Sequence, residues 1–257
     1  MLRSLYTGWT GMYTQQKRLD VISNNMANAT TVGYKKEFVT SQSFDELLTI
    51  KIRDNSEGWR RRSIGDITPG VKIGEVQYDY TQGSLRETNN PFDLGIEGNG
   101  FFKVNVVDKA GNVYESFTRA GQFHMTADGY IVDANGNHLQ SESGDFQVPV
   151  DAQQISIDVQ GYVFADGVQF DKLSLTDFED YDYLERYGEN YFQPVEGATP
   201  MAATAQVYGG YLEASNVQVV REMVDLISFT RAYESNQKIV QAYDETLGKA
   251  VNDVGKL

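Results

Sequence analysis

Few side chains in this sequence have the type and spacing that enzyme or metal chemistry requires. The two histidines, His124 and His138, stand fourteen residues apart, without the H-E-x-x-H spacing that places two imidazoles on one helix face for zinc. The run that begins at Asp133 starts like a calcium loop, but it has His138 at the glycine position and Gly144 at the position of the bidentate glutamate. We therefore expect a hairpin turn at residues 133–137, and strand or turn positions for both histidines.

Three further segments carry charge or glycine at a density that could serve catalysis or binding. The acidic and aromatic residues 177–183 hold carboxylates at glycosidase-like density, although a solvated loop or a partner surface is the preferred interpretation. Residues 95–100 are glycine-rich but lack the Lys-Ser/Thr of a phosphate loop, so a β turn is expected. Residues 60–62, three consecutive arginines, are interpreted as an exposed tip or a contact for an acidic neighbour. No catalytic residue, metal ligand or cofactor is predicted, and the chain is not expected to be an enzyme.

The composition is that of a chain with enough apolar residues for a core but without covalent cross-links. It has 257 residues, of which 40% are hydrophobic, and no cysteine, which excludes disulfides and thiolate chemistry. No run reaches the ~18–20 apolar residues of a membrane-spanning helix, and no secretory signal pattern follows Met1. If the protein leaves the cytoplasm, we expect it to do so uncleaved.

Charge is distributed unevenly along the chain. Residues 1–36 carry five basic residues and one acidic residue, a net charge of +4, whereas residues 211–257 carry −2. The net charge of −14 therefore leaves −16 on residues 37–210. Opposite signs at the two ends favour pairing of these ends, although each exposed pair contributes only about 0.2–1 kcal/mol. An acidic middle argues against nucleic acid or an anionic membrane as a partner, and it also serves solubility.

Both ends of the chain are predicted to be amphipathic helices. Apolar residues recur there in alternating steps of three and four, as in a heptad seam, and proline is absent from residues 1–36 and 211–257. Ser215 and Gln218 form a candidate capping box for the second helix. The predicted assembly-interface positions are Leu2, Leu5, Trp9, Met12, Leu19, Met26, Val219, Met223, Leu226, Tyr233, Val240 and Leu247.

Two features of these helices leave their role open. Gly8 and Gly11 weaken the first helix by up to ~1 kcal/mol each relative to alanine. The heptad pattern is equally typical of a helix pair within one monomer and of an interface between copies.

The residues between the helices have the pattern of antiparallel β-structure. Short apolar runs are bounded by turn residues, and Asp128-Gly129, Asn135-Gly136 and Asp166-Gly167 are typical of hairpins. Residues 44–48 could form a helical turn, and the rest of residues 37–80 has no predicted fold. The predicted fold class is α+β, with terminal helices that pair as a coiled-coil-like layer and a central, mainly antiparallel β domain. The predicted boundaries are an N-terminal helix over 1–36, a connecting segment over 37–80, a β-rich domain over 81–210, and a C-terminal helix over 211–257.

Several long motifs occur in a fixed order over nearly the whole chain. They include DVISNNMAN at 20–28 with TVGYK at 31–35, QGSL at 82–85, DLGIEGNGFF at 93–102 with FTRAGQF at 117–123, and motifs within 210–234. Together they resemble the bacterial flagellar basal-body rod and hook protein family, closest to its distal-rod members. The family-motif residues are Asn24, Asn25, Ala27, Asn28, Gly33, Gly83, Leu85, Gly98, Gly100, Phe101, Arg119, Gly121, Arg231 and Tyr233.

The resemblance implies a structural subunit of the flagellar rod. Such a subunit is exported unfolded by the flagellar type III apparatus and polymerises helically into a hollow, torque-transmitting shaft, outside the cytoplasmic membrane. The implied partners are further copies of this chain, other rod and hook proteins, the export apparatus and the surrounding ring proteins, with neither nucleic acid nor membrane insertion. Residues 44–48 resemble the distal-rod segment, whereas residues 6–8 fit proximal-rod relatives equally well.

Three alternatives remain at this point. One is a proximal-rod or hook-type subunit of the same family; a second is a stalked, non-flagellar binding protein with a β domain. The third is a carbohydrate-active enzyme that uses residues 177–183. Filament formation that depends on protein concentration would favour a rod or hook subunit, whereas turnover of a glycan would favour the enzyme.

Overall fold

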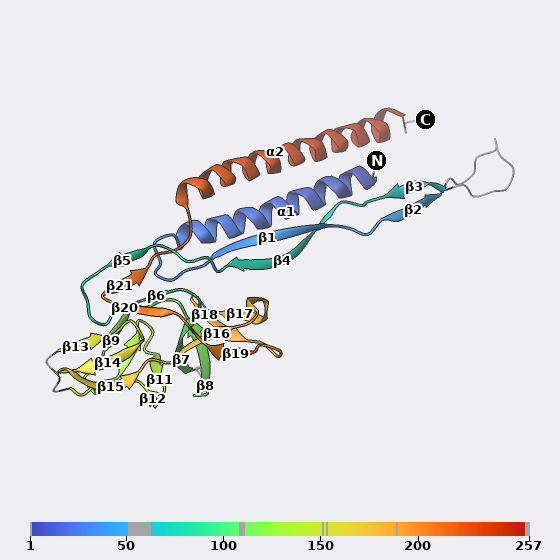
Figure 1. Ribbon diagram of the computed structural model, residues 1–257. Helices are drawn as coiled ribbons and strands as arrows, with labels where there is room; N and C mark the ends of the chain where they lie inside the picture. Colours follow the sequence, from blue (N-terminus) through green and yellow to red (C-terminus); the bar gives the residue numbers. More distant parts are fainter. Residues whose placement is uncertain are drawn as a thin grey trace. The chain divides into compact units, whose positions relative to one another are not determined.

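The computed structural model has the predicted α+β class, with one helix at each end and antiparallel strands between them (Figure 1). It describes residues 2–50, 63–107, 111–150, 152, 154–188 and 190–254. The chain forms two compact units. Unit 1 contains residues 1–27, 37–79 and 218–257, and unit 2 contains residues 28–36 and 80–217.

The two terminal helices lie side by side in unit 1 and run antiparallel (Figure 1). Helix α1 spans Leu2–Ala27, and α2 spans Val219–Lys249 before a last π-helical turn at Ala250–Val254. A Cβ atom on Gly8 would lie 3.0 Å from Val240 Cγ2, and one on Gly11 would lie 3.0 Å from Asn236 Nδ2. The glycines that weaken α1 on propensity therefore give α2 room to approach closely.

The predicted capping box at the start of α2 is wrong. Gln218 is the N-cap residue, and its side chain makes no capping hydrogen bond. Ser215 Oγ instead accepts a hydrogen bond from Val217 N at 3.3 Å, within the turn that precedes the helix. Residues 211–213 form a strand, so α2 begins later than residue 211.

The described residues between 37 and 79, namely 37–50 and 63–79, form antiparallel strand pairs in unit 1. Strand β1 (Lys36–Ser43) pairs with β4 (Val71–Asp79), and β2 (Leu47–Ile50) pairs with β3 (Ser63–Ile67). The possible helical turn at residues 44–48 is wrong, because strand β2 begins within it. Strand β4 packs against α1, and Thr7 Oγ1 donates a hydrogen bond to Pro69 O at 3.1 Å. The three arginines at 60–62 lie outside the described residues.

Unit 2 is the β domain, and its largest part is a ten-stranded sheet. A separate three-stranded sheet runs in the order β13–β14–β15, and a short 3-10 helix η1 covers Tyr181–Tyr183. The strands of the large sheet are β7 (Phe101–Val107), β8 (Val113–Thr118), β9 (Phe123–Met125), β10 (Ile131–Asp133), β11 (His138–Ser141), β12 (Gly144–Asp145), β16 (Leu175–Phe178), β17 (Leu184–Tyr187), β18 (Tyr191–Pro194) and β19 (Pro200–Ala202). The strands of the small sheet are β13 (Ile155–Ile157), β14 (Tyr162–Ala165) and β15 (Val168–Lys172).

Two further strand pairs join the beginning of the β domain to its end. Strand β5 (Leu85–Glu87) pairs antiparallel with β21 (Tyr211–Glu213), and β6 (Leu94–Glu97) pairs antiparallel with β20 (Gln206–Gly209). Leu94 and Ile96 of β6 and Val207 of β20 are fully buried. They belong to one core that also contains Phe102, Val104, Val106, Phe123, Ile131, Leu139, Phe146, Val148, Val163 and Leu173.

The three predicted hairpin turns are confirmed. Gly129 lies between the antiparallel strands β9 and β10, and Gly136 lies between β10 and β11. Asp166 and Gly167 connect β14 and β15 with φ angles of 50° and 81°. Two consecutive residues with positive φ match the type I′ turn, whose twist suits a tight hairpin.

Candidate assembly surfaces and a buried ionic junction

The predicted heptad positions are divided between partly buried and exposed sites. On α1, Leu5, Met12, Leu19 and Met26 are partly buried, whereas Trp9 is 50% exposed. The side chain of Leu2 lies outside the described residues. On α2, the partly buried positions are Leu226, Tyr233, Val240 and Leu247, and the exposed ones are Val219 and Met223.

A second apolar surface of α2 was not predicted as a stripe. Val220 is 77% exposed, Val224 60% and Ile227 52%, and Met223 lies between them. These four residues, here called the outward stripe, follow the i, i+3, i+4, i+7 spacing of one helix face. Val240 lies against α1 at Gly8, and on an ideal helix it points about 160° away from Val224. The outward stripe therefore lies on the side of α2 that is turned away from α1.

Helix α1 has an exposed aromatic row of its own. The rings of Tyr6 and Trp9 have centroids 6.0 Å apart, and those of Trp9 and Tyr13 are stacked at 5.7 Å. All three side chains are more than two-fifths exposed. Exposed aromatic rows are favourable contact surfaces, because their burial removes a large apolar area from water at a small cost in side-chain entropy.

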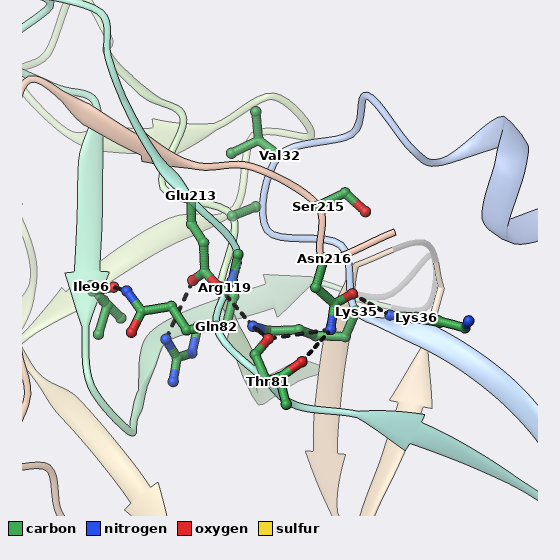
Figure 2. A network of polar contacts seen from close by, with 12 residues as sticks. Val32, Lys35, Lys36, Thr81, Gln82, Ile96, Arg119, Glu213, Ser215 and Asn216 are labelled. Atoms are coloured by element: carbon green, nitrogen blue, oxygen red, sulfur yellow. Dashed lines mark hydrogen bonds and ion pairs between the residues drawn. The ribbon is translucent and has the colours of Figure 1, made fainter. Parts of the chain in front are cut away.

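Segments from three of the sequence motifs meet in unit 2 at a buried ionic junction, formed by Lys35, Arg119 and Glu213 (Figure 2). Lys35 Nζ lies 2.7 Å from Glu213 Oε1, and Arg119 Nη1 lies 3.3 Å from Glu213 Oε2. The side chains are 2%, 4% and 1% exposed, respectively. One carboxylate therefore balances two buried cations that come from distant parts of the sequence.

The remaining hydrogen-bonding groups of this junction are largely satisfied by backbone atoms. Gly83 N donates to Glu213 Oε1 at 2.9 Å, and Lys35 Nζ donates to Thr81 O at 2.8 Å. Arg119 Nη2 donates to Gly98 O at 2.8 Å, and its guanidinium lies 5.2 Å from the ring centroid of Phe101. Such contacts offset part of the cost of removing the charges from water.

Asn216 and Gly33 join neighbouring backbone segments to the same junction. Lys36 N donates to Asn216 Oδ1 at 2.8 Å, while Asn216 Nδ2 donates to Thr81 O at 3.2 Å. Gly33 has φ of 67° and donates from N to Glu213 O at 2.8 Å. The segments before residue 37 and after residue 213 are thus both fixed within unit 2.

Other motif residues serve the end of α1 and tight backbone packing. Asn25 is fully buried, and its side chain exchanges two hydrogen bonds with the backbone of Glu37, at 2.8 and 3.0 Å. Asn28 accepts from Thr31 just beyond Ala27, the last residue of α1. The others are Asn24 and Arg231, which are exposed, Leu85 and Tyr233, which are partly buried, and Gly100 and Gly121, which pack against Ala203 and Leu94.

The hairpin at residues 133–137 has the form that the sequence predicts. Asp133 Oδ1 accepts from Asn135 N and Asn137 N at 2.8 and 3.0 Å. Tyr191 donates its hydroxyl to Asp133 Oδ2 at 2.5 Å and accepts from both asparagine side chains. Burial, followed by the hydrogen bond to Asp133, raises the pKa of Tyr191 to about 12. This is a closed hairpin network that links the loop to strand β18.

The other candidate segments also have structural roles in unit 2. Tyr181 donates its hydroxyl to Asp177 at 2.7 Å, and burial raises the pKa of Tyr181 to about 12. Asp180 caps η1 by accepting from Asp182 N at 2.9 Å. His138 lies in strand β11 with Nδ1 3.5 Å from Asp145 Oδ2, and His124 lies in β9. Among the described residues, no helix combines the length and apolar character needed to cross a membrane.

Comparisons with known proteins identify the group to which this architecture belongs. Residues 5–35 match the flagella basal body rod protein family, residues 95–165 match the flagellar hook protein FlgE/F/G D1 domain, and residues 208–253 match the flagellar basal body rod FlgEFG protein C-terminal family. The flagellar basal-body rod protein FlgG of Bacillus subtilis is 34% identical over 98% of this chain and 99% of its own length.

The chain belongs to the flagellar basal-body rod protein family. FlgG of Agrobacterium fabrum is also 34% identical, over 95% of the chain and 96% of that protein. FlgF of Caulobacter vibrioides is 30% identical over the full length of both chains. Rod proteins of this family are structural, so the chain is a structural subunit of the flagellum and not an enzyme. Membership also implies assembly with other rod and hook proteins.

The structure assigns the rod-family motifs a joint structural role that their sequence alone did not indicate. Lys35 comes from the TVGYK motif, Arg119 from FTRAGQF, and Glu213 from the C-terminal motif. Each of these charged residues stands beside apolar residues and glycines of its own motif, but nothing in the sequence pairs the three with one another. Their partnership was missed because periodicity is local, whereas these residues pair across 94 and 178 positions.

Proposed function

We propose that this rod subunit occupies the distal rod and polymerises helically through its terminal helices into a hollow, torque-transmitting shaft. In this proposal the helices form the coiled-coil-like inner layer, completed by neighbouring copies, and residues 81–210 form the outer wall. The predicted interface positions, together with the outward stripe and the aromatic row of α1, supply the contacts.

The observation that carries the proposal is the exposure of apolar side chains on both helices. Val220, Val224 and Ile227 are each more than half exposed although they occupy one helix face. Burial of apolar surface contributes about 25 cal/mol per Å2, and the contribution is repeated at every subunit of a polymer. Contiguous exposed apolar residues of this kind are typical of protein–protein contact sites.

Assignment to the distal rod is supported by the relatives. FlgG proteins from Bacillus subtilis and Agrobacterium fabrum match at 34% identity over almost the full chain, compared with 30% for the Caulobacter FlgF. FlhO of Bacillus subtilis, a flagellar hook-basal body complex protein, matches at 32% over the full length of both chains. A proximal-rod or hook-type subunit is therefore the second candidate.

The same proposal includes the route and the neighbours of the subunit. The chain is exported unfolded by the flagellar type III apparatus and assembles outside the cytoplasmic membrane. It contacts further copies of itself, rod and hook proteins at its two ends, and the surrounding ring proteins. Helices that are marginal in isolation suit this route, because a helix pair that buries little apolar surface does not resist unfolding.

Substitution within the outward stripe tests the assembly surface. In a strain that carries only the variant gene, V224D/I227D should abolish motility and rod assembly, because assembly would bury two unpaired carboxylates in an apolar contact. The matched control is Q237D/Q241D, which adds the same charge at exposed polar positions further along α2. Secretion of each variant is measured alongside rod isolation. Normal rods built from V224D/I227D would refute this assembly surface.

A further inference from the structure

The strand order of unit 2 makes its beginning dependent on its end. Within the described residues, strand β5 has β21 as its only partner, and strand β6 has β20 as its only partner. Register pairs such as Glu97–Gln206 and Leu85–Glu213 connect residues more than a hundred positions apart. Apart from the hydrogen bond from Leu94 N to Gly121 O at the start of β6, strands β5 and β6 therefore have no ladder to join until residues 206–213 are present.

The hydrophobic core shows the same dependence. Leu94 and Ile96 of β6 share one buried cluster with Val207 of β20, and Val207 is fully buried. A chain that lacks β20 leaves the β6 side of this cluster in contact with water. The free energy gained by burying Leu94 and Ile96 is then reduced.

Charge strengthens this dependence. Lys35 and Arg119 are both buried in unit 2, and the carboxylate that lies within 2.7 and 3.3 Å of them belongs to Glu213. Without Glu213, closing unit 2 would bury two cations without this counter-charge. Burial of an uncompensated charge opposes folding far more strongly than an exposed charge does.

Close backbone packing also makes residues 33 and 83–84 depend on the C-terminal strand β21 and the residue that follows it. Gly83 N donates to the Glu213 carboxylate, and Gly83 lies so close to Ala214 O that a Cβ atom would overlap it. Gly33 N donates to Glu213 O, and Ala214 N donates to Ser84 O at 2.9 Å. Gly33, Gly83 and Ser84 are thus all held against one short segment, residues 213–214.

We infer that residues 206–217 are the closing segment of unit 2, with Glu213 as its ionic latch. Residues 28–205 do not reach the compact native state until this segment joins them. Synthesis proceeds from the N-terminus, so the nascent unit stays open until its last strands are made. The consequence for export rests on the proposed function: a subunit exported from its N-terminus would keep unit 2 open until residues 206–217 have also left the cytoplasm.

Pulse-labelling hydrogen exchange during refolding of the purified full chain tests the order of closure. Peptides that cover residues 85–97 and 206–213 are followed by mass spectrometry after dilution from denaturant. In the wild-type chain both should gain protection in the same kinetic phase, because each strand pair forms only when both partners are present. Protection of residues 85–97 in an earlier phase than residues 206–213 would overturn the inference.

Three variants test the latch itself. Glu213→Gln should slow refolding by about tenfold or more, or prevent it, because two buried cations lose their counter-charge. Lys35→Met should refold much faster than Glu213→Gln, because Arg119 and Glu213 remain balanced. Glu87→Gln, an exposed acid on β5, is the matched control and should refold at the wild-type rate. Refolding of Glu213→Gln at the wild-type rate would refute the latch.

The refolding result and the proposed function can fail independently. If Glu213→Gln never folds, the time course of the wild-type chain still decides the order of closure. If the wild-type chain refolds in the expected order but does not build rods in cells, the proposed function fails and the closing segment stands. If rods form but residues 85–97 become protected first, the closing segment fails alone.

Discussion

At the scale of single residues, the most informative groups are polar and buried. Glu213 has both carboxylate oxygens engaged within the protein, Oε1 by Lys35 and the backbone of Gly83, and Oε2 by Arg119. Asn25 replaces a strand neighbour for Glu37 by pairing with both of its backbone groups. The role of these two side chains is structural: each holds together backbone segments that are distant in the sequence.

The hydroxyl of Tyr191 should make the stability of unit 2 sensitive to alkaline pH. Its pKa is raised from 10.0 to about 12 in the folded state, first by burial and then by Asp133, so the folded state favours the protonated phenol. The stabilisation is complete below pH 10 and is lost as the pH rises from about 10 to about 12. Tyr191→Phe should lower the free energy of unfolding by about 1–2 kcal/mol at pH 7, and the difference from wild type should shrink between pH 10 and pH 12.

Urea unfolding at several pH values between 7 and 12 measures this effect. Tyr183→Phe is the matched control, because its ring is 45% exposed and it lies in the same part of unit 2. If the difference in the free energy of unfolding between wild type and Tyr191→Phe stays the same across the whole pH range, the hydroxyl of Tyr191 does not stabilise unit 2 in the expected way.

At the scale of elements, the sequence predicted what local patterns encode. The terminal helices, the three hairpins and the antiparallel β domain each follow from spacing within about a dozen residues. The outward stripe was missed because Val219, Val220, Met223, Val224, Leu226 and Ile227 surround the first turns of α2 with apolar side chains. Periodicity cannot select one face of such a segment; packing against α1 does.

The buried junction and the strand pairs of unit 1 could not be predicted in this way. Lys35, Arg119 and Glu213 look like ordinary surface charges in sequence, since buried charge is rare and its partner is set by tertiary pairing. Strands β1 to β4 carry exposed residues on long stretches, so the alternation that marks a half-buried strand is weak. These strands are held by pairing of β1 with β4 and of β2 with β3, and by packing of β4 against α1, none of which the sequence pattern indicates.

The antiparallel helix pair predicts a specific cross-link. A Cβ atom at Gly11 would lie 3.5 Å from Asn236 Cγ, the atom whose place a cysteine sulfur would take, so cysteine side chains at these two positions would be in direct contact. G11C/N236C should therefore oxidise within the isolated full chain, and the absence of native cysteine removes competing bonds. G11C/K238C, with the second cysteine at an exposed position of α2, should not. Equal cross-linking of both variants would mean that α1 and α2 do not pair in this register.

At the scale of the whole molecule, the two units differ in how much apolar surface they bury. The core of unit 2 contains a cluster of thirteen buried hydrophobic residues. Among the described residues, Ile22 is the buried hydrophobic side chain of α1, and the buried residue of α2 is Glu222. Ordering a residue costs about 1–2 kcal/mol of backbone entropy, so a helix pair with so few buried apolar groups is marginal.

Limited proteolysis of the dilute chain should therefore remove the helices before unit 2 is cut. Fragments that retain residues 80–217 should persist, because local opening is easiest where few apolar contacts must break. The disulfide of G11C/N236C should slow removal of both helices, and assembly into rods should protect them in the unmodified chain. If the termini of the dilute wild-type chain resist protease as long as unit 2 does, the helix pair is already complete in the monomer. The exposed apolar faces would then be available for assembly on a preformed pair rather than on helices that become ordered as subunits join.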